Sequence, residues 1–302
     1  MKVIFIKKYK LFSFIILFFI ILIISIYFFT NNQTITTSSL SPMEKNTAID
    51  INADGIKDNF AITNNSIILS VNNRNFDLSS YYNNNLLTSS PSSWPVKSYV
   101  MKLSRNIKPE ILIQSNCNKV SNISIFRFEN NALEKIYSEN NNIFGVLNLN
   151  NTVTPICYSL ISSQGNSSLK SFIITNTEVI DTTRYYNNIP GINNILTFID
   201  LVQKDYEIDD TPNIFSEEIN SNELGILWNL SKENFTYSFQ DAFFSDDFTD
   251  KDGNITSLVW RITFERYNKG LDDNSKKEII FYLTSELDYT NDFRISGISI
   301  NQ

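Results

Sequence analysis

Four oxygen-bearing side chains recur in one short segment near the start of the chain. They occupy positions 1, 3, 5 and 9 of the pattern D-x-N-x-D-G-x-x-D and are Asp50, Asn52, Asp54 and Asp58. This spacing places their oxygens around one point, Gly55 permits a sharp bend, and the carbonyl of Ile56 adds a further ligand. Hard oxygen donors without nitrogen or sulfur suit Ca²⁺. The segment therefore predicts one calcium site, although Ala61 stands where an EF-hand has its closing glutamate. The alternative is an acidic turn without a metal.

The chain contains no histidine. Catalytic sites with an imidazole base, HExxH zinc sites and histidine-ligated haem are therefore excluded. A hydrolase that works with paired carboxylates needs no histidine, and its candidate residues here are Asp241, Asp246 and Asp247. Acidic side chains in turns are usually only solvated, and no further catalytic group accompanies these three. We therefore expect no enzyme, and keep the hydrolase as the least favoured alternative.

A second acidic cluster follows at positions 246–254. Asp252 and Gly253 stand between two alternating apolar segments, which is typical of a hairpin turn. We therefore expect a turn here, with a second cation site as the alternative.

A pattern of a polar turn, a strand and a hairpin occurs three times. The three copies begin at Asp50, Lys102 and Asn148, about fifty residues apart, which suits a repeat of three or four strands. The hairpins begin near Ile67, Ile123 and Ser171, and in each of them alternating apolar residues flank an Asn-containing turn. The pattern predicts a β-rich repeated unit.

A D-x-[DN]-x-D-G-x-x-D loop that leads into an apolar strand and a hairpin resembles the FG-GAP/VCBS repeats of bacterial surface proteins. The resemblance covers about residues 47–183. It implies strands arranged like β-propeller blades, and calcium held by the first loop through Asp50, Asn52, Asp54, Ile56 and Asp58.

Only the first of the three loops matches the family's ligand pattern in full. In the second copy the ligand positions fall on Lys102, Ser104 and Asn106, and in the third on Asn148, Asn150 and Thr152. Neither copy keeps a carboxylate by this alignment, so the resemblance implies a single metal. Three blades cannot close a propeller, which needs about four or more. We therefore expect an open partial propeller, a curved stack, or additional strands from elsewhere in the chain.

The N-terminus contains a long apolar stretch. Residues 11–29 are almost entirely apolar and, as a helix, would reach about 28 Å, close to the thickness of the hydrocarbon core. Lysines precede this stretch and none directly follows it, so the positive-inside rule predicts that residues 1–10 form a cytoplasmic tip. A cleavable signal peptide is the alternative, but the stretch is long and ends without a small-residue cleavage site. Residues 30–46 are rich in Ser, Thr and Asn and are expected to form a tether.

The charge of the chain divides at this anchor. The first thirty residues contain four lysines and no acidic residue, while the remainder carries 21 basic and 32 acidic side chains, a formal charge of −11. The whole chain has a net charge of −7, which argues against a nucleic-acid partner. The excess of Asn and Ile is typical of AT-rich bacterial genomes. We expect a single-pass protein of the bacterial cytoplasmic membrane with its bulk outside the cytoplasm.

The C-terminal part shows a different pattern from the repeats. After Pro190, apolar residues from Ile192 to Val202 recur at helical spacing, and Asn220 with Glu223 suggests the capping pair of a second helix. Four alternating strands follow, so residues 187–302 are expected to form an α+β domain with an antiparallel sheet, next to the β-rich region 47–186. Cys117 and Cys157 could form a disulfide outside the cytoplasm, or be free buried thiols.

These features favour a binding or adhesion module anchored in the membrane, with calcium stiffening the first repeat. The expected partners are a cell-wall polysaccharide or another surface protein. A structural subunit of an envelope complex is the alternative.

Overall fold

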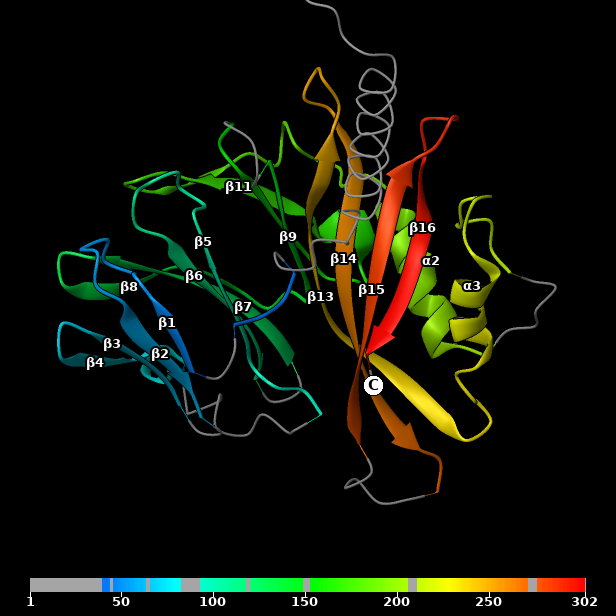
Figure 1. Ribbon diagram of the computed structural model, residues 1–302, viewed down its shortest axis with the longest axis horizontal. Helices are drawn as coiled ribbons and strands as arrows, with labels where there is room; N and C mark the ends of the chain where they lie inside the picture. Colours follow the sequence, from blue (N-terminus) through cyan, green and yellow to red (C-terminus); the bar gives the residue numbers. More distant parts are fainter. Residues whose placement is uncertain are drawn as a thin grey trace, which may run out of the picture. The chain divides into compact units, whose positions relative to one another are not determined.

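Strands dominate the described part of the chain. The computed structural model describes residues 40–43, 46–63, 66–82, 93–117, 120–148, 153–205, 211–270 and 276–301. Among these residues there are sixteen strands in three sheets and two α-helices (Figure 1). None of the three sheets closes into a barrel within these ranges. The expectation of a mainly β protein with several sheets is confirmed.

The first two sheets are four-stranded antiparallel meanders. Sheet A consists of β1 (Asn46–Ile49), β2 (Asp58–Ile62), β3 (Ile67–Val71) and β4 (Arg74–Asp77), and the short 3-10 helix η2 (Leu78–Tyr81) follows it. Sheet B consists of β5 (Lys97–Met101), β6 (Glu110–Cys117), β7 (Val120–Glu129) and β8 (Ala132–Glu139).

The third sheet, sheet C, combines two meanders in eight strands. The first meander contains β9 (Ile143–Leu147), β10 (Ile156–Leu160), β11 (Lys170–Ile174) and β12 (Val179–Asp181), with the 3-10 helix η4 (Gly165–Ser168) before β11. The second contains β13 (Phe235–Thr249), β14 (Ile255–Asn268), β15 (Lys277–Leu287) and β16 (Phe293–Asn301). Strand β9 pairs with β13 in parallel, through Ile143–Val146 and Ala242–Ser245. One continuous sheet therefore crosses the domain boundary that we expected after residue 186.

The three repeats appear as three similar meanders. Each predicted polar turn connects the first and second strands of a meander, at residues 50–57, 102–109 and 148–155. The predicted hairpins are β3–β4, β7–β8 and β11–β12. Two of these hairpins turn on Asn-Asn pairs with positive φ, Asn72–Asn73 and Asn130–Asn131, because asparagine tolerates the left-handed conformation that a tight hairpin turn requires.

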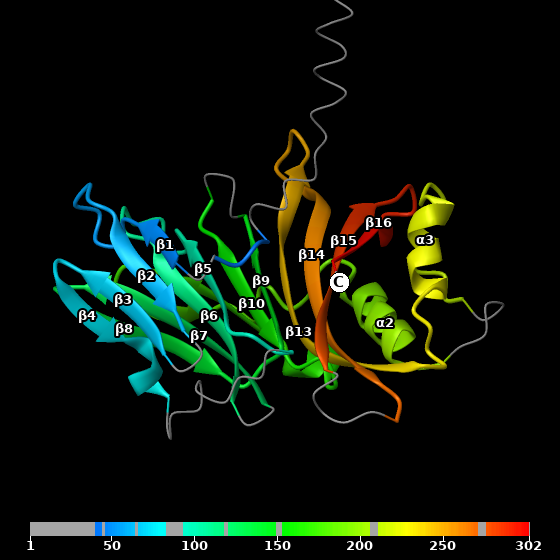
Figure 2. The same ribbon diagram turned by 60° about the horizontal axis from the view of Figure 1, so that its bottom comes forward.

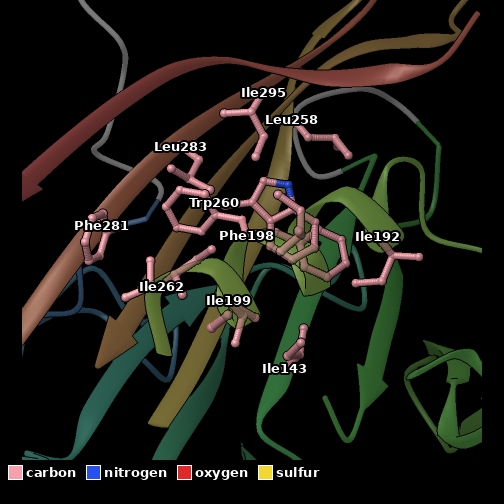
Figure 3. Close-up of a cluster of buried hydrophobic side chains, with 14 of the residues drawn as sticks. Ile143, Ile192, Phe198, Ile199, Leu258, Trp260, Ile262, Phe281, Leu283 and Ile295 are labelled. Carbon is pink, nitrogen blue, oxygen red and sulfur yellow. The ribbon is translucent and has the colours of Figure 1, made fainter. Parts of the chain in front are cut away.

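Three apolar clusters separate four layers. The first cluster lies between sheets A and B, the second between sheets B and C, and the third between sheet C and the helices α2 (Ile192–Gln203) and α3 (Ser221–Trp228). The two helices cover one face of sheet C (Figures 1 and 2). In the third cluster Trp260 is fully buried among Ile, Leu and Phe side chains from the sheet and from α2 (Figure 3). The ring of Phe244 stacks on Trp260, with 4.3 Å between the ring centroids.

Both expected helices are present, but the second is capped differently from the prediction. The side chain of Asn220 accepts a hydrogen bond from the backbone N–H of Asn222 (2.9 Å) and caps the helix as expected. The carboxylate of Glu223 does not complete a capping pair. It accepts instead from the backbone N–H of Ile298 in the edge strand β16 (2.8 Å). The hydrogen bond to the N–H of Ile298 replaces the one that Glu223 would make to the start of its own helix. An unpaired N–H at a sheet edge is costly, which favours this arrangement.

The folded unit begins within the expected tether. Leu40 is fully buried in the cluster between sheets B and C, and the backbone N–H of Met43 donates to the carbonyl of Ser98 (2.7 Å). Residues from Leu40 onward form a compact unit that is distinct from the first 39 residues. The apolar stretch 11–29 lies outside the described residues. Within the described residues, no helix is both long and apolar enough to cross a membrane.

Candidate functional sites

The acidic loop connects β1 to β2. Asp50 directly follows β1, and Asp58 is the first residue of β2. Gly55 has φ of +84°, which is the sharp bend that the pattern required, and Ala53 also has a positive φ of +60°. An alanine in this region is costly, so the loop is held in its conformation by specific interactions.

Those interactions are hydrogen bonds from the loop's own backbone. The two carboxylate oxygens of Asp50 accept from the N–H groups of Asp54 (3.2 Å) and Gly55 (2.9 Å). The side-chain oxygen of Asn52 accepts from Asp54 N–H (3.0 Å), and Asp54 accepts from Ile56 N–H (2.7 Å). The acidic side chains therefore all turn inward onto the same short segment.

Asp58 closes the loop from its far end. Its side chain is buried, and one carboxylate oxygen accepts from the backbone N–H of Ile51 (2.9 Å). Burial raises the pKa of Asp58, and the negative charges of Asp54 and Asp50 raise it further, against the lowering effect of the backbone hydrogen bonds. A cation beside these carboxylates would relieve both effects.

The donor set of this loop fits calcium in its chemistry. Three carboxylates, one amide oxygen and the Ile56 carbonyl are all hard oxygen donors. Among the described residues, however, no group of three acidic or cysteine side chains comes together closely enough to hold a metal ion. The structure thus shows a rigid acidic loop, and the metal itself stays a prediction.

In the second repeat the corresponding loop is closed by the same type of hydrogen bond, to a glutamate in place of the aspartate. Glu110, the first residue of β6, is buried and accepts from the backbone N–H of Leu103 (2.9 Å), as Asp58 accepts from Ile51. The prediction that this copy lacks a carboxylate was therefore wrong, because Glu110 occupies the ninth position of the pattern that begins at Lys102. Arg127 lies 3.5 Å from Glu110, so a guanidinium provides the positive charge here. The third copy has the apolar Ile156 at this place.

The second acidic cluster forms the expected hairpin turn between β13 and β14. A carboxylate oxygen of Asp250 accepts from the N–H groups of Asp252 (2.8 Å) and Asn254 (2.9 Å). Gly253 has φ of +84°. The side-chain amide of Asn254 also donates to Asp250 (3.0 Å), and this bond, followed by the backbone bonds, lowers the pKa of Asp250.

A buried cluster of four charged side chains joins sheet B to sheet C. Its members are Lys97 on β5, Asp241 on β13, Arg261 on β14 and Glu278 on β15. The ammonium of Lys97 lies 2.6 and 2.8 Å from the two carboxylate oxygens of Asp241 and 3.3 Å from Glu278. Arg261 lies 3.8 Å from Asp241 and 3.6 Å from Glu278.

Three members of this charge cluster are closed to solvent, while the side chain of Glu278 is 19 % exposed. Lys97 and Arg261 are each 2 % exposed and Asp241 is 1 % exposed. The indole N–H of Trp94 donates to Asp241 (2.8 Å) and covers it further. Burial lowers the pKa of Lys97, and the neighbouring Asp241 opposes that effect. Asp241 therefore has a structural role, as the ion-pair partner of a buried lysine.

The two other carboxylates of the hydrolase hypothesis lie near the end of β13. Asp246 is buried, and Asp247 is partly buried. Burial raises the pKa of Asp247, and the nearby charges of Glu286 and Asp246 raise it further, while a hydrogen bond from Ser257 lowers it.

Cys157 is a free thiol on β10. It is fully buried in the cluster between sheets B and C, and burial raises the pKa of the thiol. It therefore behaves as a small apolar residue. The side chain of Cys117 lies outside the part of the structure that is described.

Clefts with polar walls open beside the helices and the β15–β16 turn. Two of them, of about 350 and 430 Å³, share Asn213 and Arg294. The first also contains Glu217, Glu218 and Asp288. Arg294 donates to the side-chain oxygen of Asn213 (2.9 Å) and lies 3.3 Å from Asp288. Walls of this kind suit a hydrated polar ligand better than an apolar one.

No protein-family model matches the chain, and no curated protein matches it. The described residues define a mainly β protein with several open sheets.

Proposed function

We propose that the protein is a binding or adhesion module that is anchored in the bacterial cytoplasmic membrane by residues 11–29 and exposed outside the cytoplasm. Its repeats are of the FG-GAP/VCBS type, arranged as an open partial propeller, and the strands of the C-terminal α+β part extend the sheet of the third blade. One Ca²⁺ stiffens the first repeat. The observation that carries this proposal is the acidic loop at residues 50–58, in which three carboxylates share one short turn and one of them, Asp58, is buried and closes it.

The outer face of sheet A supports an open stack. Asn59, Ser70 and Asn75 are cross-strand neighbours on the face that points away from the apolar cluster. Ser70 donates to the side-chain oxygen of Asn75 (2.7 Å). A face that is polar and internally hydrogen-bonded suits solvent and not a fourth blade, so the stack ends at sheet A.

Calcium binding has a direct thermal test. Residues 40–302 are expected to melt about 5–10 °C higher in excess calcium than with a chelator, because an ion at about 100 times its dissociation constant adds about 2.7 kcal/mol. The shift should vanish in Asp54→Ala, since this substitution removes a carboxylate from the centre of the loop. Asp250→Ala, in the acidic turn between β13 and β14, is the matched control and should keep the shift. Identical wild-type curves with calcium and chelator would refute the calcium site.

The membrane anchor is tested with the full chain. We expect the intact mass after expression in a bacterium to include residues 1–29, and the protein to stay in the membrane pellet after an alkaline carbonate wash. Recovery of a shortened soluble chain would show instead that the N-terminus is a cleaved signal peptide.

The partner is sought among polar ligands. A cell-wall polysaccharide fits the polar clefts around Arg294, whose walls carry Asn and acidic side chains. Purified residues 40–302 should be retained on immobilised cell-wall polysaccharide, and Arg294→Ala should weaken retention, because this side chain holds Asn213 and Asp288 in place. Equal retention of both proteins would place the ligand elsewhere on the surface.

A further inference from the structure

The most exposed large apolar side chains share a position in the fold. The six that are most exposed among the described residues all lie at turns, at the adjoining end of a strand or in the segment that enters the next strand. One of them, Tyr185 (77 % exposed), lies in the turn after β12, and the other five share one edge of the sheets. They are Ile56 (68 % exposed), Ile107 (76 %), Val153 (57 %), Phe248 (60 %) and Tyr289 (84 %). We call these five residues the apolar tips.

Topology places the five tips on one edge of the sheets. Ile56, Ile107 and Val153 belong to equivalent connections, each between the first and second strands of a meander. Because β13 runs parallel to β9, Phe248 at its end lies on the same side as the β9–β10 connection. Because β14 and β15 are each antiparallel to the strand before them, the β15–β16 turn with Tyr289 returns to that side. Both views show the β5–β6, β13–β14 and β15–β16 turns along the upper edge of the sheets (Figures 1 and 2).

Direct contacts fix the middle of this row. The guanidinium of Arg105 donates to the carbonyl oxygens of Asn148 (2.7 Å) and Val153 (2.8 Å). The connection that carries Ile107 is thereby tied to the one that carries Val153. The Arg105 side chain and backbone carbonyls make this contact, and the side chains of Ile107 and Val153 take no part in it and stay in solvent.

Other turns at the same edge carry polar residues instead of apolar ones. The outer hairpin turns of sheets A and B end on this side too, and they carry the polar pairs Asn72–Asn73 and Asn130–Asn131. At the opposite edge, where β12 ends, the exposed large apolar residues in the described part are Val120 (48 %), Tyr185 (77 %), Tyr186 (43 %) and Tyr267 (36 %). Scattered apolar residues need no explanation, but a selective row of tips marks an interaction surface.

We propose that the apolar tips dip into the surface of a lipid bilayer, and this inference rests on the membrane anchor proposed above. Single side chains at separate turns suit a soft lipid interface, in which each tip inserts by itself, whereas a protein partner is usually met by a continuous patch. Aromatic and aliphatic tips of this kind are favoured at the headgroup level.

The length of the chain keeps the sheets close to the membrane. Leu40 is eleven positions after Phe29, the last residue of the apolar stretch, so the connection spans at most about 40 Å. Strand β13 alone has 15 residues and is about 50 Å long. The folded unit is therefore tethered within reach of the bilayer, and the apolar tips are the part of it that we propose meets the lipid.

The charges near the tips indicate which lipids the surface takes. The connection with Ile107 carries Lys102 and Arg105, while the acidic loop carries Asp50 and Asp54. Since both signs are present, insertion of the tips drives binding, and attraction to anionic lipid adds little.

The test is sedimentation of residues 40–302 with neutral phosphatidylcholine vesicles. The wild type should pellet with the vesicles, and a variant that combines Ile107→Ser, Val153→Ser and Phe248→Ser should have a partition coefficient lowered by about tenfold or more. Tyr289 is left unchanged because it also lines the first of the polar clefts around Arg294. These side chains are exposed, so the variant keeps the melting temperature of the wild type. The matched control combines Val120→Ser, Tyr185→Ser and Tyr267→Ser and should pellet like the wild type.

A second measurement uses the full chain in vesicles, in a Cys117→Ser background. An environment-sensitive fluorophore on Ile107→Cys should emit further to the blue than one on Lys269→Cys, at the opposite edge. Equal emission, equal pelleting of the wild type and the triple variant, or a wild type that stays in solution would each overturn the inference, and the last result would assign the row to a protein partner. None of these variants alters residues 11–29 or the calcium loop, so the proposed function stands or fails by its own experiments.

Discussion

Replacing Lys97 with alanine is expected to lower the free energy of unfolding by about 3–5 kcal/mol. The ammonium of Lys97 lies 2.6 Å from Asp241, and both side chains are almost completely buried between sheets B and C. Removing one partner leaves a buried carboxylate without its closest positive charge, which costs several kcal/mol. Urea unfolding of residues 40–302 measures the loss directly.

Two further variants separate charge from packing. Lys97→Met with Asp241→Leu removes both charges and keeps most of the volume, so this double variant should be more stable than Lys97→Ala. The control is Lys108→Ala on the same sheet, where a partly exposed lysine lies 3.0 Å from Glu129. An ion pair at the surface contributes at most about 1 kcal/mol. Equal losses for Lys97→Ala and Lys108→Ala would show that the buried cluster does not hold the sheets together.

A methyl group at position 145 is expected to destabilise the fold by about 3 kcal/mol. Gly145 lies on β9, opposite Phe244 of β13. A Cβ there would stand 2.2 Å from the ring of Phe244, closer than any real contact. The ring cannot move aside, because Trp260 stacks on it at 4.3 Å. Gly145→Ala must therefore push apart the parallel pair that makes sheet C continuous.

A second substitution tests this explanation. Phe244→Leu removes part of the ring, so in the background of Gly145→Ala it should recover some of the lost stability, although by itself it costs about 1 kcal/mol. Gly225→Ala is the matched control, because a Cβ at that helical position would meet its nearest atom at 3.9 Å. Alanine is a better helix former than glycine, so this control should be neutral or stabilising. An unchanged free energy of unfolding in Gly145→Ala would contradict the close approach.

Local patterns were enough to predict much of the secondary structure. The three polar turns, the hairpins that follow them, the helix after Pro190 and the alternating strands of the C-terminal part are all present at the expected places. Each of these depends on neighbours within a few residues, through turn chemistry or a short apolar period. For the same reason the sharp bend at Gly55 was predictable, whereas the hydrogen bonds from the loop's backbone to its acidic side chains were not predicted.

Contacts between distant residues were not predictable in this way. The missed carboxylate of the second repeat, Glu110, has its charged partner Arg127 17 positions further along the chain. The ion pair between Lys97 and Asp241 joins residues 144 positions apart. Glu223 accepts a hydrogen bond from the backbone N–H of Ile298, 75 positions away. Gly145 stands within the apolar segment of β9, and nothing in the local pattern identified Phe244 as its neighbour.

The sequence by itself therefore determined the acidic loop, the repeated meander, the helices and the charge difference between the N-terminus and the rest, because these follow from residue type and spacing. Tertiary structure alone decided that the third meander continues into the C-terminal strands through a parallel pair, and that the turns with apolar tips share one edge. The order of the strands depends on which strand edges pair once the apolar faces are buried. The free energy of that pairing depends on the whole fold, so no single segment of the sequence determines it.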